Sequence, residues 1–500
     1  MSASSEKKRR QAEREQGIDK KATAQREAEE KKQQSKRRWT IGTILIVLLL
    51  VSIFVLNSTL PYHLTAVTVN GTSYSAGEMN YFYSNVYSQY GYYMSMMGVS
   101  ADDVMDESTG ETWGEYIKEV AVNNVTQIEG LYQEAVANGF TLSDEGRTSV
   151  EEYIASLPDY AENYGYSSVK KFLKAAYGTG VTEGMLEELA LKQQLVSEYT
   201  QSIQDGFTYT NTELADYYAE HEAEYKTYDF LYYTVAAETE ETTDDAGETV
   251  TTVVEGGLEA AKEAADTIAA GAVSEEAFDE AIDAWMEGET SDASTGVTES
   301  SINELYRDWV TASDRVAGDV TVVGDDSGYT VVMYQGCEDQ RYPEVAVRHI
   351  LIKTEDTDGD GTYSDAEKAE ALSRIQEVEK AWNASAKTED AFAELANEYS
   401  EDAGSNTTGG LYEGIYKGEM VTEFNDFCFA EGRQPGDTGI VYGQSSSYEG
   451  YHLIYFVGTG ELHSNELARD ALVSAAYSDW QSQVLENYSA DTKFGMKLVG

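Results

Sequence analysis

Four stretches between Val345 and Gly458 decide how this chain folds. They read VAVRHILIK (345–353), FAELANEYSEDAGSNTTGGL (392–411), KGEMVTEFNDFCF (417–429) and GYHLIYFVG (450–458). The first and the last are apolar runs rich in β-branched residues, a composition typical of buried strands. Each of these two runs carries a histidine, His349 in one and His452 in the other. A pair placed in this way indicates a site where two strands that are distant in sequence lie side by side.

The segment 226–336 repeats the pattern of 345–458. The matching runs are YDFLYYTV (228–235) with VRHILIK (347–353), and EEAFDEAIDAW (275–285) with TEDAFAELANEY (388–399). In each copy an acidic loop and a helix follow the first strand, with the helices expected at Leu258–Ala270 and Ala366–Ala381. The repetition predicts two tandem copies of one α+β unit.

The first copy lacks both histidines. In the alignment of the two copies, Phe230 falls at the position of His349 and Thr330 at that of His452. If the histidines serve packing alone, their replacement is unremarkable. If they serve chemistry, the first copy is a structural or binding duplicate. The sequence leaves both readings open.

The N-terminal 60 residues divide into a charged tail and an apolar run. Residues 1–38 carry 13 Lys or Arg against 7 Asp or Glu, so we expect a solvated, basic cytoplasmic tail. The uncharged run IGTILIVLLLVSIFVL (41–56), extended by its neighbours, approaches the ~20 residues that a membrane-spanning helix needs. We therefore expect a single-pass signal anchor at residues 39–60, with the main body extracellular because Lys36–Arg38 precede the span. The alternative is a cleaved signal peptide, which would have an unusually long basic region and no clear cleavage site.

The sequence of residues 61–225 predicts a helical lobe. Ser75 and Glu78 form a capping-box pattern at the start of its first helix. Further helices are expected at Gly114–Asn138, Ser143–Ser156, Ser167–Ala176, Val181–Tyr199 and Asn211–Glu224, and a last one near the C-terminus at Ser464–Tyr488. The Tyr and Met residues of this lobe serve either as core or as an adaptable surface for unfolded chains.

The composition excludes some classes of partner. The 500 residues carry a net charge of −55, and this acidity argues against nucleic acid or anionic lipid as a partner of the main body. The two cysteines, Cys337 and Cys428, imply no disulfide framework.

Six motifs occur in order within residues 341–460. They are R-H-I-L-I, F-A-E-L-A-x-x-Y-S-x-D, G-G-L, G-E-M-x-x-x-F, G-D-T-G-I-V and G-Y-H-L-I-Y. Their order and spacing resemble a parvulin-type peptidyl-prolyl isomerase domain. With its lobe, expected anchor and C-terminal helix, the whole chain is similar to the membrane-anchored parvulin-type foldases of Gram-positive bacteria. The likeness of the lobe rests only on VNGTSYSAGEM (69–79) and on the architecture.

The resemblance implies an α+β chain with several domains behind one transmembrane helix. The expected parts are a helical chaperone-like lobe (61–225), a degenerate parvulin-like domain (226–340), a parvulin isomerase domain (341–460) and a C-terminal helical segment (461–500), a candidate to complete the lobe. The copy without histidines resembles the inactive parvulin modules of some periplasmic chaperones.

The resemblance also implies a site. The catalytic residues would be His349, Asp402 and His452, and the proline pocket would be formed by Leu411, Met420 and Phe424. An X–Pro bond rotates over a barrier of ~18–20 kcal/mol, so a catalyst needs an apolar grip on the proline ring and a site that favours the twisted amide. This chemistry requires no covalent step, no metal and no cofactor.

Two of the acidic residues need separate treatment. Asp402 would bias the tautomers of the histidines and the local field rather than act as a nucleophile. Glu449, three residues before His452, places a charge where relatives often carry a small hydroxyl residue.

The predicted pocket residues Leu411, Met420 and Phe424 also have a simpler interpretation as ordinary core.

The loop TEDTDGDGTYSDAE (354–367) follows the first strand of the second copy. Its acidity disfavours phospho-Ser/Thr-Pro substrates through like-charge repulsion. It also fits the calcium-loop pattern D-x-D-x-D-G-x5-E. The candidate Ca²⁺ ligands are Asp356, Asp358, Asp360, Thr362 through its carbonyl, Ser364 and Glu367. A solvated acidic loop is the alternative, because a strand rather than the usual helix precedes the pattern.

The sequence therefore predicts an isomerase and chaperone that assists the folding of secreted proteins at the outer face of the cell membrane. Its partners would be unfolded or partly folded secreted polypeptides with X-Pro bonds, with no nucleic acid among them. One alternative is a holding chaperone that uses parvulin folds only to bind clients. Another is a calcium-dependent surface scaffold.

Overall fold

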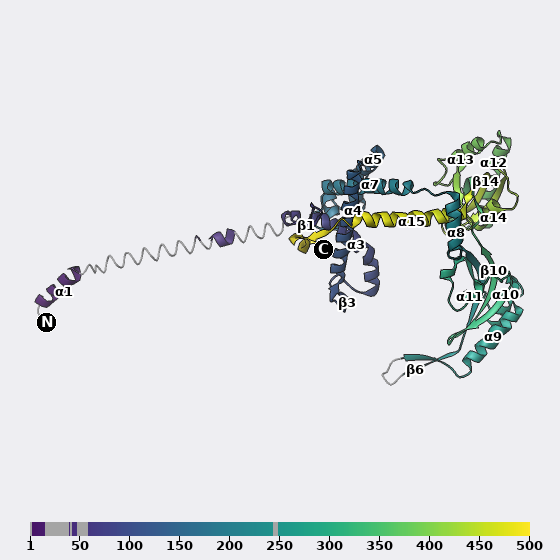
Figure 1. The fold of residues 1–500 in the computed structure, drawn as a ribbon, viewed down its shortest axis with the longest axis horizontal. Helices are drawn as coiled ribbons and strands as arrows, with labels where there is room; N and C mark the ends of the chain where they lie inside the picture. Colours follow the sequence, from purple (N-terminus) through teal and green to yellow (C-terminus); the bar gives the residue numbers. More distant parts are fainter. Residues whose placement is uncertain (1–2, 16–39, 41–42, 48–58, 244–248) are drawn as a thin grey trace. The chain divides into compact units, whose positions relative to one another are not determined.

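The computed structural model describes residues 3–15, 40, 43–47, 59–243 and 249–500. The chain forms two compact units. One consists of the residues up to Phe207 together with Ala475–Gly500, and the other of Thr208–Ser474. Figure 1 labels many of their helices and strands.

The N-terminal segment contributes the helix α1 (Ala3–Glu15). Most of the anchor predicted at residues 39–60, and most of the tail before it, lie outside the described residues. Within the described ranges, no helix has the length and apolar character needed to cross a membrane.

The first unit combines a small antiparallel sheet with a group of helices. The sheet has the order β15-β1-β2, formed by Ala490–Thr492, Thr65–Val69 and Thr72–Ser75. The last residues of the chain therefore pair with the first strand of this unit. The other elements are η1 (Leu60–His63), α3 (Ala76–Met97), β3 (Val104–Asp106), β4 (Glu111–Thr112), α4 (Trp113–Ala137), α5 (Asp144–Asn163), α6 (Val169–Tyr177), α7 (Glu183–Gly206) and η3 (Phe494–Leu498).

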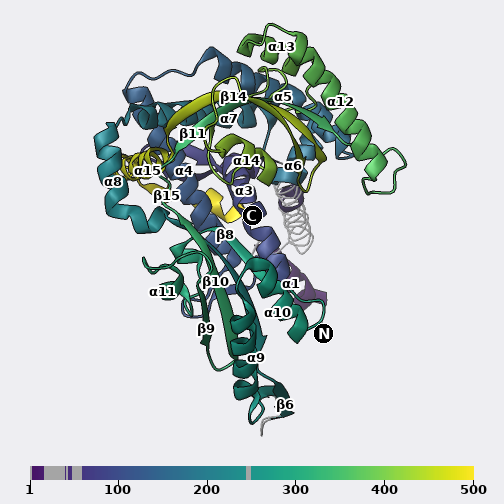
Figure 2. The same cartoon turned by 90° about the vertical axis from the view of Figure 1, so that its right-hand side faces the viewer.

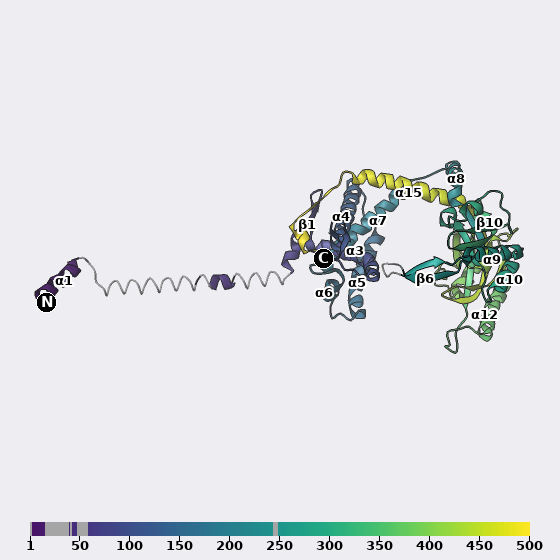
Figure 3. The same ribbon diagram turned by 90° about the horizontal axis from the view of Figure 1, so that it is seen from below.

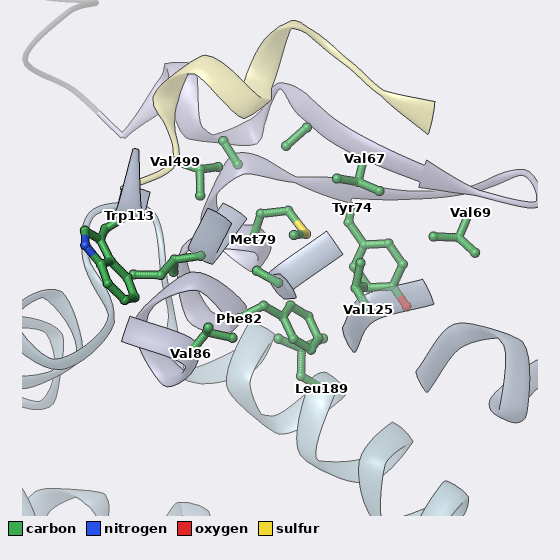
Figure 4. Close-up of a cluster of buried hydrophobic side chains, with 14 of the residues drawn as sticks. Val67, Val69, Tyr74, Met79, Phe82, Val86, Trp113, Val125, Leu189 and Val499 are labelled. Carbon is green, nitrogen blue, oxygen red and sulfur yellow. The ribbon is translucent and has the colours of Figure 1, made fainter. Parts of the chain in front are cut away.

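The core of this unit lies between the sheet and the first helices. Figure 4 shows Val67 and Val69 of β1 with Met79, Phe82 and Val86 of α3, all of them buried. The two valines alternate along the strand, and the α3 residues recur every three or four positions, so each element presents one apolar face. Burial of each such side chain contributes about 1.5–3 kcal/mol to folding.

The start of α3 confirms the predicted capping box. The Ser75 hydroxyl oxygen accepts from the Glu78 N–H at 3.2 Å, and the Glu78 carboxylate accepts from the Ser75 N–H at 2.7 Å. Together these bonds satisfy backbone donors that the first turn of a helix leaves free.

The second unit contains two antiparallel sheets of four strands each. The first has the order β8-β5-β10-β9 and the second the order β12-β11-β14-β13. If the four strands of each sheet are numbered in chain order, both sheets have the strand order 2-1-4-3. The strands are β5 (Thr227–Ala236), β8 (Asp292–Thr298), β9 (Val320–Gly324), β10 (Gly328–Glu338), β11 (Pro343–Lys353), β12 (Leu411–Ile415), β13 (Thr438–Gln444) and β14 (Glu449–Leu462), with a separate hairpin of β6 (Thr239–Thr243) and β7 (Thr249–Val253).

Helices cover both faces of each sheet. The helices α9 (Gly257–Gly271) and α10 (Glu275–Trp285) pack on one face of the first sheet, and α11 (Arg307–Val310) packs on the other. In the second sheet α12 (Asp365–Ala384) and α13 (Glu389–Tyr399) cover one face, and α14 (Thr422–Phe429) covers the opposite one (Figure 2). The same three-layer arrangement therefore occurs twice.

Tyr232, not Phe230, holds the place of His349 in the first sheet. Thr330 and His452 hold equivalent places, each two residues after a glycine near the start of its strand. The register puts the strand partner of His452 two positions after His349, and the partner of Thr330 two positions after Tyr232. The predicted match with Phe230 is therefore wrong by two residues, because local similarity does not specify strand register.

Two further helices belong to the second unit, wholly or in part. The helix α8 (Asn211–Tyr225) packs through Leu214 and Tyr218 against Ala468, near the start of α15 (His463–Leu485). Figure 3 shows α15 as one uninterrupted helix.

Candidate active site

The two histidines lie on neighbouring central strands. His349 is on β11 and pairs with Ile454 of β14, while His452 pairs with Leu351. The two side chains are therefore one diagonal step apart on the same face of the sheet. They are 5% and 3% exposed, respectively.

The imidazole rings of the pair contact each other directly. The Nδ1 atoms lie 3.0 Å apart, and the stacked rings meet at 18° with their centroids 5.3 Å apart. In such a contact one nitrogen must carry a proton and the other must offer a lone pair. The pair is thus one hydrogen-bonded group rather than two separate side chains.

Asp402 extends this group on the side of His349. The loop between α13 and β12 places Asp402 Oδ2 3.0 Å from His349 Nε2. The same oxygen accepts hydrogen bonds from the Ser405 hydroxyl at 2.6 Å and from the Tyr412 hydroxyl at 3.1 Å. The hydrogen bond with His349, together with that from Ser405, holds the pKa of Asp402 well below its usual range, although partial burial opposes the shift. Asp402 is therefore a carboxylate at neutral pH.

His452 is held neutral by its surroundings. Burial, with a smaller contribution from the neighbouring His349, lowers the pKa of His452 to about 3. On the far side of its ring, the hydroxyl of Tyr448 lies 3.1 Å from His452 Nε2. Both nitrogens of this buried ring therefore have partners.

An aromatic side chain closes the apolar side of the site. Phe424 of α14 is buried and lies edge-to-face with both imidazoles, at centroid distances of 5.6 Å to His349 and 5.3 Å to His452. Met420 is partly buried in the same cluster. The structure thus brings Phe424 against both histidines, and Met420 packs against the buried cluster that contains Phe424.

Tyr412, rather than Leu411, meets His349 from β12. Leu411 is in register with Arg348, and successive residues of a strand face opposite sides, so Leu411 belongs to the face away from His349. The ring of Tyr412 lies 5.2 Å from that of His349. The structure thus places Leu411 away from the histidines, against the prediction, and Tyr412 beside His349.

The G-G-L motif is explained by backbone geometry. Gly409 and Gly410 have φ of 71° and 70°, in the left-handed region that favours glycine. A Cβ on Gly410 would clash with the carbonyl oxygen of His349, whose N–H donates to the Gly410 carbonyl at 2.8 Å. The two glycines let the loop that carries Asp402 approach the strand that carries His349.

The charge of Glu449 is directed away from the histidines. Its carboxylate accepts from the Tyr442 hydroxyl at 2.7 Å and pairs with Lys368 of α12 at 2.9 Å. These bonds lower the pKa of Glu449. Because Glu449 and His452 are an odd number of residues apart on β14, they point to opposite faces. The departure from the family pattern thus leaves the hydrogen bonds of His452 intact.

The acidic loop brings together only part of the predicted calcium set. Carboxylate oxygens of Asp356, Asp358 and Glu367 lie within 4.8 Å of one another. Asp360 instead accepts from the N–H and the hydroxyl of Thr362, both at 2.8 Å.

Glu367 has a structural task in this loop. It forms a capping box with Ser364 at the start of α12, and Thr357 donates to its other oxygen from both N–H and hydroxyl at 2.6 Å. These hydrogen bonds, those from Thr357 foremost, lower the pKa of Glu367 to about 2.

Three members of the site were missed from the sequence. Ser405, Tyr412 and Tyr448 all offer hydroxyl groups to Asp402 or His452. Two of them lie in loops, where no periodicity marks the direction of a side chain. The Asp-x-x-Ser spacing of Asp402 and Ser405, which is typical of a local side-chain turn, was the available signal.

Known proteins resemble the part of the chain that holds this site. Residues 329–457 match a family model described as PPIC-type PPIASE domain. Foldase protein PrsA 1 of Listeria monocytogenes is 32% identical over 157 residues, which make up 31% of this chain and 44% of the relative. Chaperone SurA of Alkalilimnicola ehrlichii is 28% identical over 190 residues, or 35% of this chain and 40% of the relative. The chain thus spans less than half the length of these curated relatives.

Solved structures give a more distant likeness. The crystal structure of PrsA from Bacillus subtilis covers 78% of this chain and 93% of its own, at 14% identity and a TM-score of 0.30. The sequence match is the stronger finding, and it includes His349, Asp402 and His452. Residues 329–457 therefore belong to the PPIC-type, or parvulin, family of peptidyl-prolyl isomerase domains.

Proposed function

We propose that this chain is a peptidyl-prolyl cis/trans isomerase that assists the folding of secreted proteins, and that residues 341–460 carry the activity. The observation that supports this most directly is the hydrogen-bonded row Asp402–His349–His452, whose two histidines are buried beside the ring of Phe424. A polar row against an aromatic wall offers both features that the rotation of an X–Pro bond requires. One is an apolar grip for the ring and the other is a polar face for the amide.

Each group has a distinct role in this proposal. Met420, Phe424 and Tyr412 hold the proline ring. The row of histidines presents a fixed dipole pattern to the amide, whose carbonyl and nitrogen change their polarity as the bond twists out of conjugation. Asp402 fixes the orientation of His349. Because the change is a rotation, no bond is broken and no proton has to leave the site.

The test is the rate of cis-to-trans conversion of an X-Pro tetrapeptide by the full chain. We expect His349→Ala and His452→Ala each to lower kcat/KM by at least about tenfold, a loss of about 1.4 kcal/mol of transition-state stabilisation. His221→Ala is the control, since that histidine lies on α8 and contacts Glu224 there. If the wild-type chain does not exceed the uncatalysed rate, the proposal of enzymatic activity is wrong.

We infer further that residues 226–340 are a degenerate copy of the isomerase domain. The supports are the shared strand order and the paired replacements, Tyr232 for His349 and Thr330 for His452. The loop 286–291 between α10 and β8 is also shorter than the loop 400–410 that carries Asp402 and Ser405. A chain with His349 and His452 both replaced is therefore expected to have no residual isomerase activity. A residual activity that falls when Tyr232 or Thr330 is replaced would contradict the inference.

A specific observation favours a second activity, the holding of unfolded chains. At the C-terminal end of α3, Tyr92 and Met96 are 76% and 71% exposed, and Tyr93 and Met97 beside them are also exposed. Exposed apolar groups of this size on one helix end are typical of surfaces that bind other chains. Flexible methionines also adapt to varied partners.

Suppression of aggregation of a denatured client protein tests this second activity. We expect a chain with Tyr92→Ser and Met96→Ser to suppress aggregation less well while it keeps its isomerase rate. Tyr160→Ser is the control, because Tyr160 is an exposed tyrosine on α5 of the same unit. If the wild type, the double variant at Tyr92 and Met96, and Tyr160→Ser all suppress aggregation equally, then α3 is not part of the holding site.

We also propose that the loop 354–367 binds Ca²⁺ weakly. In support, Asp356, Asp358 and Glu367 converge, and Gly361 takes a φ of 83° at the turn. Calorimetric titration of the full chain with millimolar Ca²⁺ is the test, and Asp358→Asn is expected to abolish the heat of binding. Asp365→Asn is the matched control in the first turn of α12. Absence of heat and of a thermal shift in the wild type would rule out the calcium site.

We propose finally that residues 39–60 anchor the chain as a single span, with the main body outside the cytoplasm. The supports are the uncharged run 41–56 and the basic residues before it. The anchored chain should stay with membranes in an alkaline wash, and deletion of 39–60 should release it. Release of the intact chain by that wash would contradict the anchor.

A further inference from the structure

Tyr448 lies at the open end of the row of histidines. It belongs to the turn between β13 and β14, where the Ser445 N–H donates to the Tyr448 carbonyl at 2.9 Å. Its half-buried ring meets the His452 ring at 67° with a centroid distance of 5.7 Å, and its hydroxyl is 3.1 Å from His452 Nε2. Each ring nitrogen of the pair therefore has a hydrogen-bond partner, and the row ends in two oxygen groups, Asp402 and Tyr448.

The direction of the hydrogen bonds can be worked out from the Asp402 end. A carboxylate only accepts, so the proton between Asp402 and His349 lies on His349 Nε2. The single proton of the Ser405 hydroxyl points to Asp402 at 2.6 Å, which leaves its lone pairs toward His349 Nε2 at 3.2 Å. Two acceptors thus converge on that nitrogen and favour the Nε2–H form of His349.

The rest of the row follows step by step when both rings are neutral. With its proton on Nε2, His349 offers a lone pair at Nδ1. The contact between the two Nδ1 atoms then requires the proton of His452 to lie on its Nδ1. This leaves His452 Nε2 as an acceptor, so the hydroxyl of Tyr448 must donate to it. All the hydrogen bonds then run in one direction, from Tyr448 to Asp402.

We propose that Tyr448 is a positioning residue of the isomerase site, whose hydroxyl donates to His452 Nε2 and holds His452 in the Nδ1–H tautomer. This role rests on the proposed isomerase function, but the assignment of the tautomer does not. Without the hydroxyl, a buried ring nitrogen loses the donor that the described part of the chain offers it, and the two tautomers of His452 approach each other in energy. A mixture of the two tautomers then presents two different dipole patterns to the substrate.

The first copy provides an independent observation. Its strand β10 aligns with β14 from Gly328 and Gly450 onward, but the hairpin before it is shorter. Tyr329 pairs with Gly324, whereas Tyr451, at the equivalent place, pairs with Tyr442. The shorter hairpin of the first copy therefore has no counterpart of Tyr448. There the hydroxyl of Thr330, at the place of His452, bonds instead to Thr234 at 2.9 Å. The copy without histidines has thus also lost the tyrosine that would orient one of them.

Long-range ¹H–¹⁵N spectra of the histidine side chains test the tautomer. The full chain has five histidines, so the signals of His452 can be assigned by their loss in a single His452 variant. We expect the wild type to show His452 as Nδ1–H and His349 as Nε2–H. In Tyr448→Phe, we expect the His452 Nε2 resonance to move away from its hydrogen-bonded value. An Nε2–H form of His452 in the wild type would overturn the proposal.

Kinetics then separate positioning from substrate contact. We expect Tyr448→Phe to lower kcat about tenfold with KM within about twofold of wild type, the size of effect of one lost hydrogen bond to a buried group. Tyr442→Phe is the matched control. It removes a hydroxyl from the same hairpin, and that hydroxyl donates to Glu449 rather than to His452. A rise in KM at constant kcat would show that Tyr448 contacts substrate and would overturn the proposed role.

The two readouts keep this inference apart from the proposed function. If the chain has no isomerase activity but Tyr448→Phe still shifts the His452 resonance, only the function is wrong. If the activity is present and Tyr448→Phe matches Tyr442→Phe in both spectrum and rate, only the role of Tyr448 is wrong.

Discussion

Asp402 organises more of the site than any other single side chain. One of its oxygens accepts hydrogen bonds from His349, Ser405 and Tyr412, and its other oxygen accepts from the Gly404 N–H at 3.2 Å. Hydrogen bonds to a charged acceptor are about twice as strong as those between neutral groups. A half-buried carboxylate with these donors keeps His349 in one orientation before any substrate arrives.

Replacement of Asp402 should therefore cost activity rather than fold. We expect Asp402→Ala to lower kcat/KM by about 10–100-fold, corresponding to about 1.5–3 kcal/mol for a hydrogen bond to a charged group. Proline-peptide turnover by the full chain measures the effect. Glu401→Ala is the control, because the neighbouring carboxylate pairs with Arg374 instead. Equal rates for the two variants would show that His349 is oriented without Asp402.

The burial of His452 predicts a pH dependence of stability. Its pKa is about 3 in the folded chain and ~6.5 when unfolded, so between these values the unfolded chain binds a proton that the folded chain excludes. The free energy of unfolding therefore falls as the pH falls, by up to about 2 kcal/mol between pH 7 and pH 5. The pKa of Asp402 is also lowered, but its contribution is lost only below about pH 4.

Amide exchange of β14 at the two pH values would measure this loss as the free energy of opening. His452→Thr is the matched variant, since the first copy carries Thr330 at that place. We expect the variant to lose the His452 share of the pH dependence. A slope as steep in the variant as in the wild type would assign the effect to other groups.

At the residue scale, the sequence predicted those site residues that belong to apolar strands or to recognisable motifs. His349, Asp402 and His452 meet as expected from their motifs, and Phe424 joins them. Leu411 was misplaced by one residue, because the side-chain direction along β12 depends on a register that the sequence does not state. The hydroxyl partners were missed because loop side chains have no periodicity to mark their direction.

At the scale of elements, helices were more predictable than strand register. The helix predicted at Asn211–Glu224 occurs as α8, one residue longer. The helix predicted to end at Ser156 instead continues through Pro158 to Asn163. Leu157 packs in a buried cluster with Leu173 and Leu186, and this packing compensates for the hydrogen bond that the proline removes.

The tight approach of the loop 400–410 to β11 can be tested at Gly410. Gly410→Ala would place a Cβ against the His349 carbonyl at a φ of 70°, so we expect a loss of more than about 2 kcal/mol of stability and a large loss of activity. Gly418→Ala is a matched control, since Gly418 has a φ of 86° with nothing within 4 Å of an added Cβ. It should cost only about 1 kcal/mol, the price of a left-handed alanine.

Urea unfolding followed by isomerase assays of the folded fraction would separate the two effects. If both glycine variants lose the same stability, the close approach at Gly410 contributes nothing beyond backbone strain. If Gly410→Ala is destabilised but fully active, the loop does not need this approach to position Asp402.

At the scale of the whole molecule, charge is the dominant property. Residues 341–460 carry 23 Asp or Glu against 9 Lys or Arg, within a chain of net charge −55. The acidic loop 354–367 follows directly on β11, the strand that holds His349. A substrate therefore approaches the histidine row through a negative potential that extends about one Debye length, roughly 10 Å at 0.1 M salt.

This potential predicts a substrate preference. For tetrapeptides X-Pro that differ only in X, we expect Lys or Arg to give a kcat/KM about threefold above Glu, and phosphoserine to be the poorest substrate. The difference should arise mainly in KM, because the charge acts on approach rather than on the twisted amide. It should shrink as salt rises from 0.05 to about 0.5 M, since screening shortens the range of the field. Equal rates for Lys and Glu at low salt would contradict the preference. A preference unchanged by salt would instead indicate a direct contact with X inside the site.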